Sequence, residues 1–313
     1  MVRTSAVTAT GNPEPAVRLT HLTKSFGPRR GIRGVDLEVN PHQVFGFLGP
    51  NGAGKSTTIR LMLGLYHPTS GTRQVLGLDP VRDHAELMRR VGYLPGELTL
   101  FGRLTGQEIL DRFAHARAMT DLSTRRDLAQ RFGAELDRPV RTLSKGNRQK
   151  IGLLLAFQHR PELLVLDEPT SGLDPLLQDE FAQLLEEVVA AGSTVFLSSH
   201  DLAEVQRVVH QLAIIREGQI VAADSVEGLR ARAPRVIELL FPARPNPATY
   251  AALPGTELRA TDSRRLVLAV TGPVTPVLAA AAKDGAEDIV ARPADLDELF
   301  LTFYADKESS HDA

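Results

Sequence analysis

The chain of 313 residues contains no cysteine. Disulfides, thiolate metal sites and cysteine nucleophiles are therefore excluded, and this composition suits a reducing compartment such as the cytosol. A strong net charge is also lacking, because the formal net charge at pH 7 is only -2. A chain so close to neutrality attracts polyanions weakly, so we expect no nucleic acid as its main partner.

Long apolar runs are absent as well. The longest runs, such as residues 151–157 with the sequence IGLLLAF, fall far short of the roughly 20 residues that span a bilayer. Residues 1–15 mix Thr, Ser, Ala, Gly and Pro around no apolar centre, so we expect a disordered tail and neither a signal peptide nor an anchor. Any role at a membrane is therefore expected to depend on a separate partner protein.

The length and the 42% hydrophobic content predict a substantial core and about two domains. Over residues 16–230, apolar runs alternate with helical patterns, which is typical of an α/β domain with a largely parallel sheet. Strands are expected at residues 44–48, 163–167 and 194–198. Helical periodicity with charged faces over about residues 85–160 predicts a helical insertion in this domain.

A second, smaller domain is expected over residues 231–313. The order of its predicted elements is strand, helix, strand, strand, helix, strand, and a final helix follows. This order resembles a split βαβ unit, a small α+β module. The strands are expected at residues 236–240, 257–260, 266–270 and 288–291, and the helices near Thr249 and at residues 274–283 and 296–304.

A glycine-rich segment that follows the strand at 44–48 carries the most specific signal. Its pattern, G-x-x-x-x-G-K-S, is that of a loop that binds nucleoside triphosphates through its backbone amides. Lys55 is expected to reach the β- and γ-phosphates, and the Ser56 hydroxyl to bind magnesium. A helical pattern begins at the end of the loop, where a helix N-terminus favours anions. The loop consists of Gly49, Pro50, Asn51, Gly52, Ala53, Gly54, Lys55 and Ser56.

Two further strands end in residues that suit triphosphate hydrolysis. The strand at 163–167 ends in Asp167 and is followed by Glu168. A parallel strand places such residues at the ligand-binding edge of the sheet. Asp167 can hold magnesium through water, and Glu168 can orient or deprotonate the attacking water, although an acidic turn is the alternative. His200 follows the strand at 194–198 and can bridge the γ-phosphate, the water and Glu168, although a surface histidine is the usual alternative.

The segment at residues 143–150 reads Leu-Ser-Lys-Gly-Asn-Arg-Gln-Lys and precedes a strong helical pattern. Ser144 and Gly146 would present a hydroxyl and a backbone N–H at a helix start, which is a second position that favours anions. Taken by itself, the segment is a weak signal, because Ser-x-Gly at a helix start is usually an ordinary N-cap.

The order and spacing of these segments resemble the nucleotide-binding subunit of ABC transporters over about residues 17–220. The resemblance implies an α/β P-loop NTPase core with a RecA-like parallel sheet, an antiparallel β subdomain and a helical subdomain. It also implies that Phe26 stacks on adenine, although a core phenylalanine is the alternative. By the same resemblance, the Walker A loop is Gly49 to Thr57, the Walker B strand Leu163 to Glu168, the D-loop Ser171 to Asp174, the signature Leu143 to Asn147, and the switch histidine His200.

The resemblance implies a function as well. Two copies sandwich ATP, so that Ser144 and Gly146 of one copy meet the γ-phosphate held by the other, and hydrolysis drives a separate membrane permease from its cytoplasmic face. The region beyond about residue 230 resembles the C-terminal domain of daunorubicin-resistance-type exporter ATPases, with residues 299–304 as its closing helix, and this points to export of an unidentified substance. A generic α+β appendage is the alternative.

Two departures from the family pattern stand out. Gly96 and Glu97 occupy the place where the family usually has glutamine, so either Glu97 substitutes for it or that contact is absent. Lys145 and Asn147 stand where glycine and glutamine are common, and Lys145 adds a positive charge near a phosphate. A nucleotide-dependent switch without useful turnover remains an alternative because of Gly96. A relative that acts on ribosomes or DNA is another, although the chain has one cassette and no sustained heptads.

Overall fold

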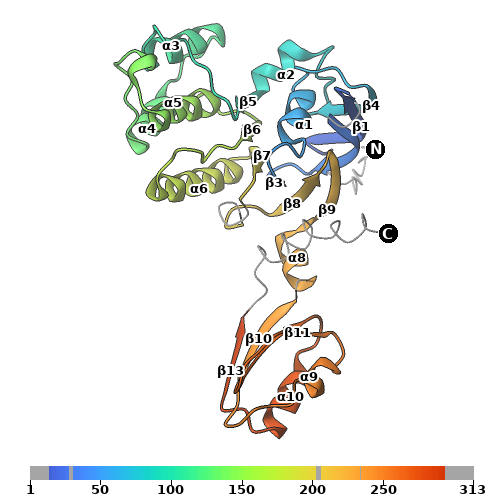
Figure 1. Cartoon of the computed structure of the whole chain (residues 1–313). Helices are drawn as coiled ribbons and strands as arrows, with labels where there is room; N and C mark the ends of the chain where they lie inside the picture. The colour runs from blue at the N-terminus through green and yellow to red at the C-terminus, as the bar shows by residue number, and fades with distance from the viewer. Residues whose placement is uncertain (1–13, 28–30, 202–205, 233, 293–313) are drawn as a thin grey trace, which may run out of the picture. The chain divides into compact units, whose positions relative to one another are not determined.

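The computed structural model describes residues 14–27, 31–201, 206–232 and 234–292 (Figure 1). Most of the tail expected at residues 1–15, and the final helix expected at 296–304, lie outside these ranges. The chain divides into two compact units, one ending at Ala223 and the other beginning at Asp224. None of the helices in the described ranges has both the length and the apolar character needed to cross a bilayer.

A six-stranded sheet forms the centre of the larger unit, in the order β5-β6-β7-β3-β8-β9. The pairs from β5 to β8 are all parallel, and every residue of β3, β6 and β7 is buried, as in a parallel sheet that is covered on both faces. The three strands predicted from the sequence are therefore adjacent, although 114 residues separate the end of β3 from the start of β6. The strands are β3 Val44–Leu48, β5 Val91–Leu94, β6 Leu163–Asp167, β7 Thr194–Ser199, β8 Gln211–Arg216 and β9 Gln219–Ser225.

An antiparallel sheet of three strands, in the order β2-β1-β4, packs against this centre. The buried side chains of β1 and β2, including Leu19, Leu22 and Val35, join one core with Phe47 and Val165 of the parallel sheet. Helix α1 contributes its apolar side to the same core, so one hydrophobic interior supports both sheets. The elements are β1 Val17–Ser25, β2 Gly31–Val39, α1 Lys55–Met62 and β4 Ser70–Val75.

Helices α3, α4 and α5 group together in the larger unit, away from the antiparallel sheet (Figure 1). The range predicted as a helical insertion, about residues 85–160, contains helices but also a strand that was not predicted, edge strand β5 at residues 91–94, which pairs with β6. This strand has only four residues, which is too few to distinguish period 2 from period 3.6. Gly92 lets it pass beneath the end of α5, because a Cβ there would overlap the carbonyl oxygen of Ala156. The elements are α2 His84–Arg90, α3 Gly106–Ala116, α4 Ser123–Arg131, η1 Val140–Thr142, α5 Lys145–Phe157 and α6 Pro175–Ala190.

The smaller unit contains an antiparallel sheet in the order β11-β12-β10-β13, and its elements run βαββαβ after the connecting helix α8. The predicted split βαβ order is thus confirmed for the described residues. Its core is separate from that of the larger unit and includes Ile237, Leu268, Tyr250 and Val277. The elements are α8 Val226–Arg232, β10 Arg235–Leu240, α9 Pro247–Ala251, β11 Thr256–Thr261, β12 Arg265–Val270, α10 Thr275–Lys283 and β13 Asp288–Arg292.

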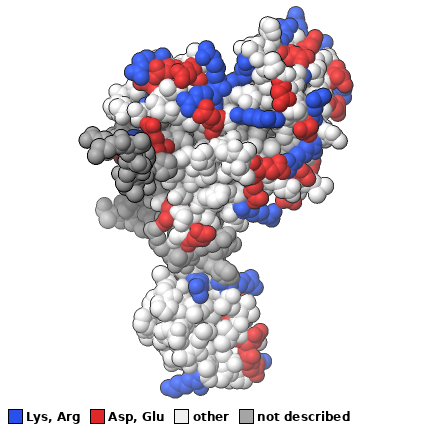
Figure 2. Space-filling model, turned by 180° about the vertical axis from the view of Figure 1, so that it is seen from behind, with Lys and Arg blue, Asp and Glu red and all other residues white. Residues whose placement is uncertain are grey.

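Charged side chains are mixed on the face that Figure 2 shows. Among the described residues on that face, basic and acidic side chains lie interspersed over the larger unit. This distribution agrees with the small net charge of the sequence.

Candidate active site

A cavity of about 540 Å³ opens where β3 and β6 end. Polar side chains and glycines from segments far apart in the sequence line it, as expected for the carboxyl edge of a parallel sheet. The lining residues are Gly31, Pro50, Asn51, Gly52, Gly54, Lys55, Ser56, Thr57, Arg60, Gly96, Glu97, Asp167, Glu168, Ser171 and His200.

The glycine-rich loop connects β3 to α1 and forms one wall of this cavity. Gly49 lies behind the wall, where a Cβ would overlap the carbonyl oxygen of Ile215. Gly54 has a φ of 116° and directly precedes Lys55, so the chain turns sharply into the helix through a conformation that favours glycine. No acidic residue stands in the first turn of α1, so nothing there competes with an anion for its free N–H groups.

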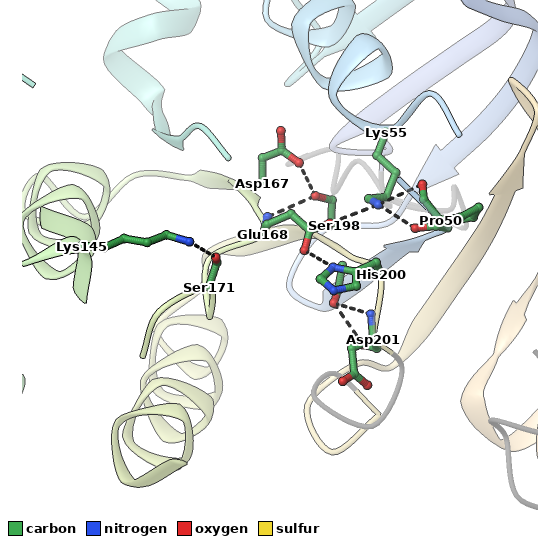
Figure 3. A network of polar contacts seen from close by, with 11 residues as sticks. Pro50, Lys55, Lys145, Asp167, Glu168, Ser171, Ser198, His200 and Asp201 are labelled. Carbon is green, nitrogen blue, oxygen red and sulfur yellow. Dashed lines mark hydrogen bonds and ion pairs between the residues drawn. The ribbon is translucent and has the colours of Figure 1, made fainter. Parts of the chain in front are cut away.

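Lys55 is only 6% exposed, and its ammonium is surrounded by oxygen atoms. It donates to the carbonyl oxygens of Gly49 at 2.6 Å and Pro50 at 3.3 Å. It also forms an ion pair with Glu168, with 3.1 Å between Nζ and Oε1 (Figure 3). The ammonium therefore already lies inside the loop, where the phosphates of a nucleotide would displace its present partners.

Asp167 and Glu168 are both held by Ser198 on the neighbouring strand. The Ser198 hydroxyl donates to Asp167 Oδ1 at 2.5 Å, and the Glu168 backbone N–H donates to the Ser198 carbonyl at 3.1 Å. Glu168 has a φ of 52°, a left-handed conformation that costs a non-glycine residue about 1–2 kcal/mol. This conformation turns the chain at the strand end, and the carboxylate faces the cavity.

His200, which follows β7, completes a chain of contacts with Glu168, which follows β6, and Lys55 at the start of α1 (Figure 3). Its Nδ1 lies 2.6 Å from Oε2 of Glu168, so one oxygen of that carboxylate faces the imidazole and the other faces Lys55. Glu168 Oε1 is buried and makes no hydrogen bond within the described part of the chain. It therefore has unused capacity to accept a proton or a hydrogen bond from water.

Several residues predicted for the site do not line this cavity. Phe26 is 50% exposed and makes an edge contact with Tyr66, with 5.5 Å between ring centroids. Ser144 accepts from the backbone N–H of Asn147 at 3.1 Å, which is an ordinary N-cap of α5. The remaining residues of this group are Gly49 and Ala53, which form the back of the loop, and Gly146 and Asp174, at the starts of α5 and α6.

Sequence reasoning missed three residues of the site or its support, namely Gly31, Arg60 and Ser198. Arg60 stands four residues after Ser56, one helical turn further along α1, and that spacing could have identified it. Its guanidinium donates to the Tyr66 hydroxyl at 3.1 Å, and this hydrogen bond raises the pKa of Arg60. Ser198 carried a signal as well, because it is a polar residue near the end of an apolar strand.

The place of Gly96 beside Asp167 explains why a glycine is tolerated there. A Cβ on Gly96 would lie 3.3 Å from Cγ of Asp167, so the glycine leaves the space beside this carboxylate clear. The adjacent Glu97 also lines the cavity.

Oxygen donors in the cavity suit a magnesium ion. The Ser56 hydroxyl and the Asp167 carboxylate are hard ligands of the kind that Mg²⁺ prefers. No group of three or more His, Cys, Asp or Glu residues that could hold a metal occurs in the part of the chain that the structure describes. Mg²⁺ usually keeps several water ligands and is held by one or two carboxylates together with substrate phosphates.

Comparison with known proteins supports the predicted fold. Residues 32–171 match the family model described as ABC transporter. The daunorubicin resistance ATP-binding protein DrrA3 of Streptomyces coeruleorubidus is 32% identical over 309 residues, which cover 94% of this chain and 97% of that protein. The chain belongs to the ABC transporter family of ATP-binding proteins. The bacitracin transport ATP-binding protein BcrA of Bacillus licheniformis is 33% identical over 225 residues, 71% of this chain and 74% of that protein.

A solved structure of the ATP-binding subunit of an ABC transporter superposes with a TM-score of 0.64 at 28% identity, over 69% of this chain and 92% of that chain. The predicted α/β P-loop ATPase fold is confirmed, and this ABC transporter protein binds and hydrolyses ATP to energise transport through a separate permease. ATP-binding subunits of the family dimerise around ATP and pair with membrane permease components.

Proposed function

We propose that this chain is the ATPase subunit of an exporter, and that it works as a pair of identical copies on the cytoplasmic face of a membrane permease. One observation carries the catalytic part of the proposal: Lys55, Glu168 and His200 are in unbroken contact in one cavity. Export is supported by the similarity to DrrA3 over 94% of the chain, which includes the smaller unit. The transported substance would bind to the permease.

ATP would bind with its phosphates in the glycine-rich loop. The charge-assisted bonds of Lys55 to the β- and γ-phosphates are stronger than its present bonds to neutral carbonyl oxygens. Two phosphates also offer Lys55 more charged oxygens than the single Glu168 oxygen that it now contacts, so we expect phosphate binding to draw the ammonium away from Glu168 and to remove the counter-charge of that carboxylate. Ser56 and Asp167 would hold Mg²⁺, which neutralises phosphate charge when it is bound.

We assign Glu168 as the general base that orients or deprotonates the attacking water. Its Oε1 is the oxygen that loses Lys55 when phosphate binds, and this oxygen has no hydrogen bond in the described chain. The imidazole of His200 fixes the other oxygen and so sets the orientation of the carboxylate. The same step that binds the substrate thus makes the base available.

A second copy of the chain would complete the site. Ser144 and Gly146 lie outside the cavity of their own chain, at the start of α5. Their hydroxyl and backbone N–H suit the γ-phosphate of a nucleotide bound to the partner. We assign Asp174, which caps α6 through the N–H of Leu177 at 3.0 Å, to the same interface, and Phe26 to stacking on the adenine.

Substitution of Glu168 by glutamine tests the assignment of the base. Glu168→Gln should lower ATP turnover by about 10²–10⁴-fold, the usual contribution of a positioned general base, while ATP affinity does not fall. The matched control is Glu162→Gln, which removes a carboxylate from the segment before β6, where it pairs with Arg90 at 2.7 Å. Steady-state phosphate release measures both, and turnover of Glu168→Gln at the parent rate would rule out this role.

Substitution of Lys55 by alanine tests the loop itself. Lys55→Ala should weaken ATP binding about tenfold or more, because charge-assisted bonds to two phosphates are lost. An equilibrium titration with a fluorescent ATP analogue measures this change. Unchanged affinity would show that the phosphates do not bind here.

A further inference from the structure

Lys145 links the start of α5 to the nucleotide cavity without lining the cavity itself. Its ammonium donates to the Ser171 hydroxyl at 3.0 Å, and Ser171 is one of the lining residues (Figure 3). The aliphatic part of the Lys145 side chain lies against Gly172. A Cβ added to Gly172 would be 3.6 Å from Cδ of Lys145. The side chain therefore connects two functional regions of one chain.

The backbone around this contact is tightly packed. A Cβ on Gly146 would lie 2.8 Å from the carbonyl oxygen of Gly172, so the two segments approach as closely as a glycine allows. The buried side chain of Gln149 donates to the Pro169 carbonyl at 2.9 Å. The start of α5 and residues 169–172 are thus fixed to each other, whereas the exposed ammonium of Lys145 can change partners.

The position of Lys145 favours a change of partner when an anion arrives. It is the first residue of α5, and no acidic residue stands in that turn. A cation there faces the positive end of the helix dipole, which is unfavourable until a negative group is added. A serine hydroxyl is a neutral acceptor, whereas a phosphate oxygen forms a charge-assisted bond that is roughly twice as strong.

We propose that Lys145 exchanges its bond to Ser171 for a bond to the γ-phosphate of ATP bound to the second copy. This inference rests on the proposed function, because it requires two copies that close around nucleotide. The exchange releases the Ser171 hydroxyl into the cavity of its own chain. The state of one nucleotide site is thereby transmitted to the other through a single side chain.

The test measures ATP-dependent pairing of the full chain in the Glu168→Gln background, which keeps ATP unhydrolysed. When Lys145→Met is combined with Glu168→Gln, the affinity between the two copies should fall about tenfold, as measured by sedimentation at low salt. This is the effect of losing one charge-assisted bond. Methionine keeps the packing on Gly172. Lys145→Arg should restore pairing. Lys150→Met is the matched control on the same helix, where the ammonium donates to the Gly133 carbonyl at 3.4 Å, and this variant should pair normally.

Ser171→Ala separates the exchange from a simple charge effect. Removing the competing acceptor should strengthen pairing several-fold, and the gain should vanish when Lys145→Met is also present. A gain that persists in that double variant, or normal pairing of Lys145→Met, would overturn the proposal.

Two controls distinguish failure of the Lys145 exchange from failure of the proposed ATPase function. ATP binding to the single chain, measured at low protein concentration, should not change in Lys145→Met, because Lys145 does not line its own cavity. A loss of that binding would also contradict the exchange. If Glu168→Gln itself neither binds ATP nor pairs, the proposed function fails, whatever Lys145 does.

Discussion

His159 makes the folded protein sensitive to acid at a place remote from the nucleotide cavity. The partly buried imidazole lies just beyond α5, and its Nε2–H donates to the Val91 carbonyl at 3.1 Å. Its Nδ1 is buried and has no hydrogen-bond partner among the described residues. Burial, together with the positive charge of Arg117, lowers the pKa of His159 to about 4, although the bond to Val91 acts in the opposite direction.

The sign of the effect follows from this lowered pKa. The unfolded chain takes up the proton near pH 6.5, whereas the folded chain does so only near pH 4. Stability is therefore full above pH 6.5 and is lost progressively as the pH falls toward 4. At about 1.36 kcal/mol for each pH unit, the loss has a ceiling of about 3 kcal/mol. Solvent access to the ring reduces the expected loss to about 1–2 kcal/mol.

Urea unfolding followed by circular dichroism at pH values from about 7.5 to 4.5 measures this loss. Other groups titrate in the same range, so the useful quantity is the difference in unfolding free energy between the parent and His159→Gln. Glutamine keeps a donor for Val91 but cannot take up a proton. The parent should lose stability relative to His159→Gln only below about pH 6.5. A difference that stays constant over the whole range would refute the reasoning.

Two further predictions concern packing. Gly49→Ala should lower the unfolding free energy by about 1–3 kcal/mol and weaken ATP binding, because the new Cβ overlaps the Ile215 carbonyl. Gly102→Ala is the control, because its new Cβ would lie no closer than 3.5 Å to other atoms and its backbone is not left-handed; equal effects of the two substitutions would contradict this account. Tyr250→Phe should cost about 1–2 kcal/mol, because the Tyr250 hydroxyl donates to Asp284 at 3.0 Å. Its ATPase activity should match that of the parent, and an unchanged melting curve would argue against the bond.

The parts of the fold that could be predicted from the sequence are those with local patterns. The strand β3 is an apolar run followed by the glycine-rich loop, and β6 and β7 are each followed at once by a polar site residue, so these patterns identify both the strands and their ligand-binding ends. Lys55 was recognisable because the spacing of the glycines around it is fixed by the phosphate geometry.

Other features depend on pairing between distant segments. The strand β7 lies between β6 and β3, and only this order lets Ser198 hold Asp167. Nothing local in the sequence specifies that order. The bond between Lys145 and Ser171 joins residues 26 positions apart, and it likewise depends on how α5 packs against the loop after β6.

The left-handed backbone at Glu168 has a consequence for which amino acids that position can accept. Val or Ile there would suffer crowding between the branched Cβ and the main chain, whereas Gly, Asn and Asp adopt the conformation readily. In a library of all twenty amino acids, selection for folding alone would therefore already remove the bulky branched ones. The frequency of each amino acid at position 168 must therefore be compared with the amount of soluble protein that the variant yields. Only a variant that is soluble and still depleted can be said to have lost hydrolysis.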